Sequence, residues 1–326
     1  QLPEAVEFVR GEVRDRELLG ATRDGIEIVY HQAAEVGVGQ SMYEMERYVA
    51  GNSLATAVLL EAIAERRPPV RKVIVASSMS IYGEGAYSCA DCGPVAPGLR
   101  PTAQLERRDW EVNCPTCQGP LETIPTSEDK PLAPASVYAI TKQDQEQLCL
   151  SVGAAYDIPT VALRYFNVYG PRQALSNPYT GVAAIFSSRL LNGNAPYVYE
   201  DGGMIRDLIH VSDIVQGNLL AMEREDVAHE VFNIGTGRPL TVLALAETLC
   251  RELNPTVRPV IAGKFRAGDI RHCYADIGKA RRMLGFEPKM RFEDGLSDLL
   301  AWVRTQHADD AFETAQRELR QRGLVQ

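Results

Sequence analysis

The sequence contains no long apolar run. None of its stretches approaches the roughly 18 to 20 uninterrupted apolar residues that cross a bilayer. Its first residues, Gln1-Leu2-Pro3-Glu4, have neither the basic start nor the apolar region of a secretory signal. We therefore expect a soluble, cytoplasmic protein without a membrane partner.

Basic residues are also scarce relative to acidic ones. The chain carries 34 lysines and arginines against 43 acidic residues, which gives a formal net charge of −9. This balance repels phosphate backbones, so nucleic acid is not an expected partner. With 326 residues, of which 45% are hydrophobic, the chain can bury the core of one large domain or two moderate ones.

A third absence concerns glycine. A sheet that binds a dinucleotide ordinarily opens with a strand and a glycine-rich turn, and the helix after that turn holds the pyrophosphate. Nothing before Glu7 provides this turn, and the glycines within 31–39 follow a later strand pattern without the fingerprint. These 326 residues therefore do not contain the usual pyrophosphate-binding turn.

Short β-branched runs alternate with longer helical patterns along the first half of the chain. Two patterns predict helices, at 40–65 and 138–155. Four runs are typical of strands: 7–10, 26–30, 72–75 and 160–165. This alternation predicts an α/β fold in which helices cover both faces of a parallel sheet.

The same patterns divide the chain into parts. Residues 1–173 form the expected sheet domain, with an insertion at 84–134 that is rich in glycine, proline and cysteine. Residues 174–326 form a smaller mixed domain, of which about 207–240 return to the sheet. Residues 310–326 are charged and helical, and we expect them to be peripheral.

Four of the seven cysteines are spaced like metal ligands. Cys89, Cys92, Cys114 and Cys117 form the pattern Cys-x2-Cys-x21-Cys-x2-Cys, in which two turns each offer a pair of thiolates to a tetrahedral zinc ion. We expect a zinc-ribbon-like insertion with a structural zinc, because four thiolates leave no open position for chemistry. The alternatives are four unliganded thiols in a surface loop or a redox pair.

A tyrosine and a lysine stand four residues apart in one of the predicted helices. Tyr138 and Lys142 would share one helix face, where the ammonium could lower the pKa of the phenol. Ser78 follows the predicted strand at 72–75 and stands at its C-terminal end. Ligands bind at this edge in open parallel sheets. The three side chains together are typical of a proton-relay site. Taken alone, the Tyr-x3-Lys spacing also fits a solvated helix face with a core aromatic.

Five motifs then occur in a fixed order between residues 77 and 237, within a longer stretch of similarity over roughly residues 5–305. They are Ser77-Ser78-Met79-Ser80-Ile81-Tyr82-Gly83, Tyr138-x3-Lys142, Arg164–Arg172, Arg206–Asp213 and Asn233–Gly237. In this series the chain resembles the extended short-chain dehydrogenases that act on nucleotide sugars. The resemblance implies a doubly wound Rossmann domain, a smaller substrate domain, NAD as cofactor, a nucleotide-diphosphate sugar as substrate and a homodimer. Family members begin earlier, so we expect a further N-terminal segment to complete the NAD site.

The resemblance also implies which residues hold the cofactor. Glu12 and Val13 stand where the family has an acidic and an aliphatic residue around the adenine, although the usual acid is aspartate. The turn Ala33-Ala34-Glu35 would pass beside the adenosine and pyrophosphate, and Asn52 would support the cofactor from the next helix. Ser77 belongs to the same expected set, and Tyr138 and Lys142 would reach the nicotinamide ribose.

The substrate residues follow from the same resemblance. Ser78 and Ser80 are expected at the sugar, and Asn167 at the sugar diphosphate. Arg206, Arg266 and Asp269 correspond to positions that grip the nucleotide, since guanidinium groups neutralise phosphates and a carboxylate accepts from ribose hydroxyls. Two local interpretations compete: an ion pair between Arg206 and Asp207, and a simple turn over 266–269.

One dipeptide narrows the predicted reaction. Nucleotide-sugar 4,6-dehydratases resemble this chain but carry Asp-Glu after the catalytic hydroxyl, because elimination of water needs a further acid and base. Met79 and Ser80 stand there instead, so oxidation and reduction at one carbon remain. The four-cysteine insertion and the segment 177–182 look most like dTDP-L-rhamnose 4-epimerases, which interconvert dTDP-L-rhamnose and dTDP-6-deoxy-L-talose.

Three alternatives stay open at this point. UDP-glucose and UDP-glucuronate 4-epimerases share the same catalytic residues. A nucleotide-sugar 4-reductase would instead release its nicotinamide cofactor after every turnover. A zinc-ribbon interaction protein that uses the dinucleotide fold only as a scaffold is the non-enzymatic alternative.

Overall fold

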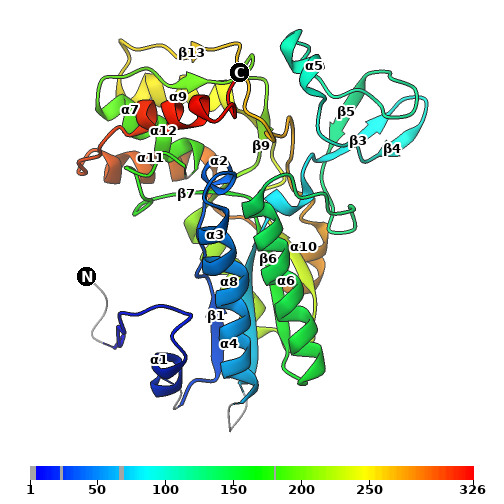
Figure 1. Ribbon diagram of the computed structural model, residues 1–326, viewed down its shortest axis with the longest axis vertical. Helices are drawn as coiled ribbons and strands as arrows, with labels where there is room; N and C mark the ends of the chain where they lie inside the picture. The colour runs from blue at the N-terminus through cyan, green and yellow to red at the C-terminus, as the bar shows by residue number, and fades with distance from the viewer. Residues whose placement is uncertain (1–4, 23–24, 66–69, 180) are drawn as a thin grey trace.

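The computed structural model describes residues 5–22, 25–65, 70–179 and 181–326. Figure 1 shows three regions: a parallel sheet with long helices beside it, a cap of C-terminal helices at one end of that sheet, and a small insertion projecting sideways. The segment 177–182, used above for the subclass, includes residue 180, which lies outside the described residues.

Four parallel strands form the central sheet in the order β1-β2-β6-β11. Their bounds are β1 Ile28–His31, β2 Lys72–Ser78, β6 Thr160–Tyr165 and β11 Val231–Ile234. Ile74 and Val75 are both fully buried although they point to opposite faces of β2. A strand buried on both faces is the mark of a doubly covered parallel sheet, so the predicted α/β class is confirmed.

Each face of the sheet has its own helices. On one face, Val75 packs in a cluster with Leu60 and Cys149, which belong to α4 (Ala55–Ala64) and α6 (Val137–Ala155). On the other face, Ile74 packs with Ile214 of α8 (Val211–Glu223) and with residues of α10 (Gly278–Leu284).

The predicted helix at 40–65 is divided into several pieces. It consists of α2 (Val38–Ser41), α3 (Met45–Tyr48), a π-helical turn (Val49–Leu54) and α4. Residues 42–44, between α2 and α3, form a turn, so the helix expected at 40–65 is not continuous. The π-helical turn contains Asn52, which is fully buried, and such turns are frequent at functional sites.

The strand expected at 7–10 does not form. These residues are extended, their side chains are exposed, and Phe8 keeps 71% of its surface in water. The apolar alternation was present, but a strand also needs a neighbour for its backbone groups, and the described residues offer none. A short helix, α1 (Arg16–Ala21), follows.

The C-terminal region packs around its own core. Its helices are α7 (Val182–Leu191), α9 (Val242–Leu253), α11 (Phe292–Val303) and α12 (Phe312–Gln321). Three short strand pairs surround them: β7 (Asn167–Tyr169) with β10 (Leu208–His210), β9 (Ile205–Arg206) with β12 (Leu240–Thr241), and β8 (Tyr197–Val198) with β13 (Val260–Ile261). Within the segment 207–240, α8 and β11 belong to the central sheet layer.

The insertion is a small antiparallel sheet that follows a 3-10 helix (Met79–Tyr82). Its strand order is β4-β3-β5, with bounds β3 Ala86–Cys89, β4 Gly93–Val95 and β5 Leu121–Ile124, and α5 (Thr102–Glu106) lies between β4 and β5.

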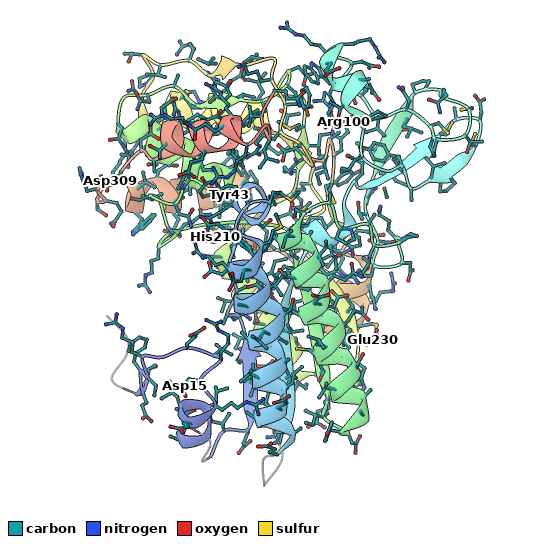
Figure 2. The ribbon with its side chains drawn as sticks, viewed as in Figure 1. Asp15, Tyr43, Arg100, His210, Glu230 and Asp309 are labelled. Carbon is teal, nitrogen blue, oxygen red and sulfur yellow. The ribbon has the colours of Figure 1, made fainter. Side chains whose placement is uncertain are left out.

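Buried charges join the insertion to the C-terminal region. Arg100, labelled in Figure 2, donates to both carboxylate oxygens of Glu200 at 2.9 Å. Arg271 donates to Glu200 at 2.9 Å and also to Glu111 of the insertion. The three side chains of Arg100, Glu200 and Arg271 are at most 2% exposed.

None of the helices in the described part of the chain combines the length and apolar character needed to cross a bilayer.

Candidate active site

A cavity of about 570 Å³ opens where the sheet domain meets the C-terminal region. One wall comes from the carboxyl ends of β2 and β6 and from the first turns of α6, the place where open parallel sheets bind ligands. The rest of the lining comes from α7, from the segments around β8 and β9, from residues 266–270 and from α12.

Ser78 is the last residue of β2 and the N-cap of the 3-10 helix that follows. Its hydroxyl accepts from the backbone N–H of Ser80 at 3.2 Å and from the hydroxyl of Ser80 at 2.9 Å. Both serines line the cavity, together with Met79. The turn thus fixes the Ser78 hydroxyl and does not use its proton.

Tyr138 stands in the first turn of α6, which begins after the N-cap Ser136. The Ser136 hydroxyl accepts from the backbone N–H of Ala139 at 3.1 Å and fixes the start of the helix. Tyr138 lines the cavity, and its ring meets the ring of Tyr48 edge-on at 6.4 Å. Burial raises the pKa of the Tyr138 phenol, and the hydrogen bond with Ser78 opposes that rise.

Lys142 lies one turn along the same helix and lines the same cavity, buried to 4% exposure. Burial lowers the pKa of its ammonium to about 8, against the opposing charges of Cys149 and Glu146. The spacing predicted a lowered pKa for Tyr138, but in this structure the pKa of Tyr138 is raised. Desolvation of the phenol causes this rise, and the lowering that was expected from Lys142 together with bound NAD stays a prediction.

A buried polar network holds Lys142, and the sequence argument missed it. The ammonium donates to Gln145 at 2.8 Å, and the amide of Gln145 contacts the ring nitrogen of His31 at 3.1 Å and donates to Thr56 at 2.9 Å. Burial, and then the charge of Lys142, lower the pKa of His31 to about 4. The only sequence signal was that Gln145 follows Lys142 by three residues, on the same helix face.

Asn52 orders the turn at 33–35. Its side-chain oxygen accepts from the backbone N–H of Glu35 at 2.6 Å, and its amide donates to the carbonyl of Glu35 at 3.1 Å and to Thr141 at 2.9 Å. Ala34 lines the cavity, whereas Ala33, Glu35 and Asn52 do not. Asn52 therefore acts on the cavity through the turn that it holds.

Two of the predicted cofactor residues lie elsewhere. Glu12 and Val13 stand in the exposed segment before α1, where Glu12 accepts from Arg14, and neither lines the cavity. Ser77 does line it, and its hydroxyl donates to Glu146 at 2.6 Å. Glu146 in turn pairs with the buried Arg164 at 2.6 Å.

Arg206 and Asp207 do not form the local ion pair considered above. Arg206 lines the cavity and donates to the backbone carbonyls of Ile205, Ile270 and Arg271 at 2.8 to 3.0 Å. Asp207 points away and accepts from the backbone N–H groups of residues 236, 237 and 275. Arg206 thus enters the cavity with its charge unneutralised by its neighbour.

Arg266 and Asp269 line the cavity, and the guanidinium of Arg266 donates to the carboxylate of Asp269 at 2.8 Å. Both belong to a turn in which the backbone N–H of Asp269 donates to the carbonyl of Arg266 at 3.2 Å. The guanidinium of Arg266 lies 4.6 Å from the centre of the Tyr199 ring. Asn167, at the start of β7, lines the same cavity, and its buried side-chain oxygen has no partner among the described residues. The three side chains offer charged and polar groups to one ligand.

The peripheral position expected for 310–326 was wrong. Phe312, Ala315, Gln316 and Leu319 of α12 line the cavity, and Gln316 is only 2% exposed. The charged composition predicted a helix in solvent, but these four residues form an i, i+3, i+4, i+7 stripe that faces inward.

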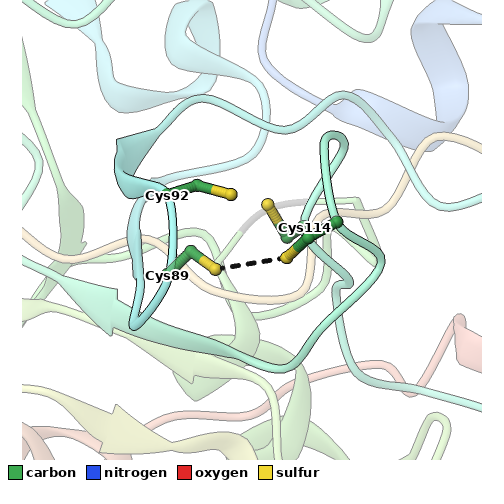
Figure 3. Close-up of side chains that lie close together, drawn as sticks. Cys89, Cys92 and Cys114 are labelled. Carbon is green, nitrogen blue, oxygen red and sulfur yellow. Dashed lines mark hydrogen bonds between the residues drawn. The ribbon is translucent and has the colours of Figure 1, made fainter.

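The four cysteines of the insertion come together. Their sulfur atoms all lie within 4.8 Å of one another, and Cys89 and Cys117 are 3.5 Å apart. Figure 3 shows the sulfurs of Cys89, Cys92 and Cys114 turned toward a common space. Backbone N–H groups of Cys117 and Thr116 lower the pKa of the Cys114 thiol to about 6, whereas neighbouring sulfurs raise the pKa of Cys92 to about 12.

The sheet is parallel and covered on both faces, and its cavity combines Ser78, Tyr138 and Lys142 with the arginines of the C-terminal region. This combination is typical of a dinucleotide-dependent enzyme of the short-chain dehydrogenase type. The chain belongs to the NAD dependent epimerase/dehydratase family, whose profile matches residues 1–98 and 112–235. The predictions of the family and of an enzyme are therefore confirmed.

Known proteins that resemble the chain over most of its length agree with this assignment. It is 35% identical over 278 residues to dTDP-L-rhamnose 4-epimerase of Burkholderia thailandensis, which covers 85% of this chain and 75% of that protein. The solved UDP-glucose 4-epimerase of Thermotoga maritima with UDP-glucose has a TM-score of 0.74 and 31% identity, with coverage of 93% and 86%. UDP-glucuronic acid 4-epimerase of Bacillus cereus, solved with UDP-glucuronic acid and NAD, has a TM-score of 0.73 and 26% identity, with coverage of 93% and 83%.

Proposed function

We propose that this enzyme is an NAD-dependent nucleotide-sugar 4-epimerase that interconverts dTDP-L-rhamnose and dTDP-6-deoxy-L-talose. The observation that carries the proposal is that one cavity holds both a proton-transfer wall, with Ser78 and Tyr138, and two arginines, Arg206 and Arg266. The first set can act at a sugar hydroxyl, and the second can bind a diphosphate. The relative from Burkholderia thailandensis supports the choice of sugar and base.

The residues of the sheet wall fit the nicotinamide half of NAD. Tyr138, Lys142 and Ser77 line the cavity at the carboxyl ends of the strands, and Lys142 presents a buried ammonium with three donors. When bound there, NAD would supply hydride transfer from and back to C4 of the sugar, so the reaction would have no net redox change.

Tyr138 moves the proton in this scheme. In its phenolate form Tyr138 takes the proton of the 4-hydroxyl as the C4–H bond breaks, and the resulting phenol gives the proton back to O4 when that bond re-forms on the other face. The Ser78 hydroxyl donates to O4 and stabilises the charge that develops there. Arg206 and Arg266 hold the diphosphate while the 4-keto sugar turns over between the two steps.

Met79 and Ser80 argue against a dehydratase. Both line the cavity directly after Ser78, where a 4,6-dehydratase needs an acid and a base. A thioether cannot ionise, and a serine hydroxyl already bonded to Ser78 does not supply a base. The site therefore supports oxidation and reduction at C4 without elimination of water.

Product analysis without added cofactor tests the proposal. Intact protein incubated with dTDP-L-rhamnose, UDP-glucose or UDP-glucuronate should convert dTDP-L-rhamnose to its 4-epimer and leave bound NAD in its oxidised form. Conversion of a UDP-sugar instead would reassign the substrate. A demand for stoichiometric NADPH would make the protein a reductase, and no product with any sugar nucleotide would favour the interaction protein.

A structural zinc at the four cysteines is part of this proposal. Ligands at 2.3 Å from a tetrahedral zinc stand about 3.8 Å apart, which agrees with sulfur atoms that all lie within 4.8 Å. One bound zinc per chain, lost in Cys114→Ser but retained in Cys149→Ser, is the expected result of metal analysis. Absence of zinc from freshly purified protein would leave the insertion as a thiol cluster.

We also propose a homodimer. The π-helical turn and α6 lie side by side, and both expose apolar side chains: Val49 is 48% exposed, Leu54 50% and Ile140 48%. Light scattering should give twice the chain mass of 35.9 kDa, and Ile140→Asp should reduce it to the single mass. A wild-type protein with the single mass at micromolar concentration would contradict the dimer.

A further inference from the structure

The last segment of the chain is bound to both sides of the cavity. From the sheet side, the hydroxyl of Tyr43 donates to Glu318 of α12 at 2.8 Å; Tyr43 is labelled in Figure 2 beneath the C-terminal helices. On the other side, residues 324–326 pair with 265–267, with backbone bonds of 3.0 to 3.1 Å. Because residue 266 is an arginine of the cavity, α12 is held where a bound nucleotide would lie.

The part of the cavity beneath α12 is lined mainly by aromatic rings. Tyr197 and Tyr199 meet edge-on with ring centres 5.3 Å apart, and Phe312 of α12 lies 5.5 Å from Tyr197. Phe186 of α7 also lines the cavity. Flat apolar walls of this kind suit a planar heterocycle better than a sugar, whose hydroxyls need polar partners.

Gln316 places an amide in this aromatic surrounding. Gln316 is only 2% exposed. Its amide nitrogen donates to the hydroxyl of Tyr199, and its side-chain oxygen has no partner among the described residues. An unpaired buried acceptor is costly, so such a group ordinarily finds a partner in a ligand or a water. Since the Tyr199 hydroxyl accepts from Gln316, its own proton remains available as a donor.

We infer that Gln316 and Tyr199 recognise the nucleobase of the substrate by the imide edge of a uracil or thymine ring. This inference rests on the proposed function and adds the residues that select the base. The unpaired oxygen of Gln316 accepts from N3–H of the base, and the Tyr199 hydroxyl donates to a neighbouring ring carbonyl. Cytosine presents an unprotonated N3 at the same place, so two acceptors would face each other.

The positions of the two arginines proposed to hold the diphosphate agree with this assignment. Arg266 stacks on the face of Tyr199 at 4.6 Å, and Arg206 lines the same cavity. A base beside Gln316 thus lies next to the arginines that would hold its phosphates, and the sugar extends from there toward Tyr138. The amide of Gln316 is therefore a specificity-determining group that takes no part in the chemical step.

Nucleotide binding measured by calorimetry on the intact protein tests the inference without any turnover. UDP, dTDP and CDP are titrated into the wild type, Gln316→Met, Tyr199→Phe and Gln321→Met. Methionine keeps the length of glutamine without its polar atoms, and Gln321 is an exposed glutamine at the end of the same helix. Phenylalanine keeps the ring of Tyr199 on which Arg266 stacks.

We expect the wild type to bind UDP and dTDP at least about tenfold more tightly than CDP. Gln316→Met should weaken UDP and dTDP about tenfold to a hundredfold and CDP little, so that the preference disappears. Tyr199→Phe should reduce the same preference, and Gln321→Met should match the wild type. If Gln316→Met unfolds, Tyr199→Phe alone decides the outcome.

The possible failures are distinguishable. A wild type that binds none of the three nucleotides contradicts the proposed function itself. A wild type that binds all three equally, or a UDP preference that survives in Gln316→Met and in Tyr199→Phe, overturns the role of α12 and leaves the epimerase proposal standing.

Discussion

Tyr138 is the residue on which the proposed chemistry depends, so its hydroxyl should separate catalysis from binding. Tyr138→Phe keeps the ring that meets Tyr48 and removes the group that moves the proton. We expect kcat to fall about a hundredfold to ten-thousandfold with little change in the affinity for the nucleotide sugar. The comparison is Tyr156→Phe, which changes an exposed tyrosine at the end of the same helix. A Tyr138→Phe variant with near-normal turnover would contradict the assignment.

His31 makes the stability of the protein depend on pH. Its pKa is about 4 in the folded protein and near 6.5 in the unfolded chain. Between these values the unfolded chain binds a proton that the folded protein does not, so stability falls as the pH decreases from 7 toward 4. The contribution of His31 between pH 7 and pH 5 is about 2 kcal/mol.

Urea unfolding of the wild type and of His31→Gln at both pH values measures that contribution. Glutamine cannot take up a proton, and it can still bond to Thr56, which lies 2.8 Å from the ring of His31. We expect the loss of stability between pH 7 and pH 5 to be about 2 kcal/mol smaller in the variant. Equal losses in the two proteins would show that the histidine titrates normally.

At the scale of residues, the sequence predicts which side chains line the cavity better than it predicts their pKa shifts. The spacing of Tyr138 and Lys142 is enough to place both on one helix face, and the cavity contains both. The direction of the pKa shift of Tyr138 could not be predicted, because it depends on how deeply the ring is buried. Gln145 was missed for a similar reason, since its partners His31 and Thr56 come from distant segments.

The insertion and the C-terminal region are joined by a buried charge cluster that behaves as one element. Glu200 accepts from Arg100 and Arg271, and its side chain is 1% exposed. Glu200→Gln leaves Arg100 without a carboxylate in a buried place, and we expect a loss of about 3 kcal/mol in the free energy of unfolding. Urea unfolding at neutral pH measures it.

The neighbouring carboxylate provides the control for this prediction. Asp201 also pairs with Arg271, at 2.7 Å, but its side chain is 46% exposed. Water screens an exposed pair, so Asp201→Asn should cost about 1 kcal/mol or less. If the two variants lost the same free energy, the burial of Glu200 would carry no energetic consequence.

At the scale of elements, apolar periodicity predicts a helix or strand correctly where the apolar face finds a packing partner. It fails where the element depends on a neighbour that the pattern does not reveal. The helix expected at 138–155 is α6 (Val137–Ala155), and the strand expected at 160–165 is β6. The run 7–10 has the right alternation but no neighbouring strand among the described residues, so it does not form one. The inward stripe of α12 was hidden by the charged residues that surround it, and only the fold shows what the stripe covers.

The whole molecule builds its site from segments that are far apart in sequence. The proton-transfer wall comes from residues 77–80 and 138–142, the arginines from 206 and 266, and a further wall from α12. The motifs predicted the first set and Arg206, and the family resemblance implied Arg266. The third could not be predicted, since it depends on the last helix folding back over the cavity.

The attachment of α12 to the sheet side therefore belongs to the function of the whole molecule. Glu318 accepts from Tyr43 at 2.8 Å and from Tyr179 at 2.9 Å, and these bonds lower the pKa of its carboxyl. Glu318→Ala removes both contacts at a residue that does not itself line the cavity, although its partner Tyr179 does. We expect KM for the nucleotide sugar to rise about fivefold to tenfold while kcat stays unchanged. Each lost hydrogen bond to the charged carboxylate weakens the packing of α12 over the cavity.

Hydrogen exchange shows whether this effect acts through α12. Amide protons of α12 should exchange faster in Glu318→Ala than in the wild type, whereas those of α6 should not change. Glu313→Ala is the matched control, because Glu313 stands on the same helix, is 66% exposed and pairs with Arg189 of the C-terminal region at 3.3 Å. A raised KM without faster exchange in α12 would mean that Glu318 acts on the substrate by another route, and unchanged KM would mean that α12 stays closed without its attachment to the sheet domain.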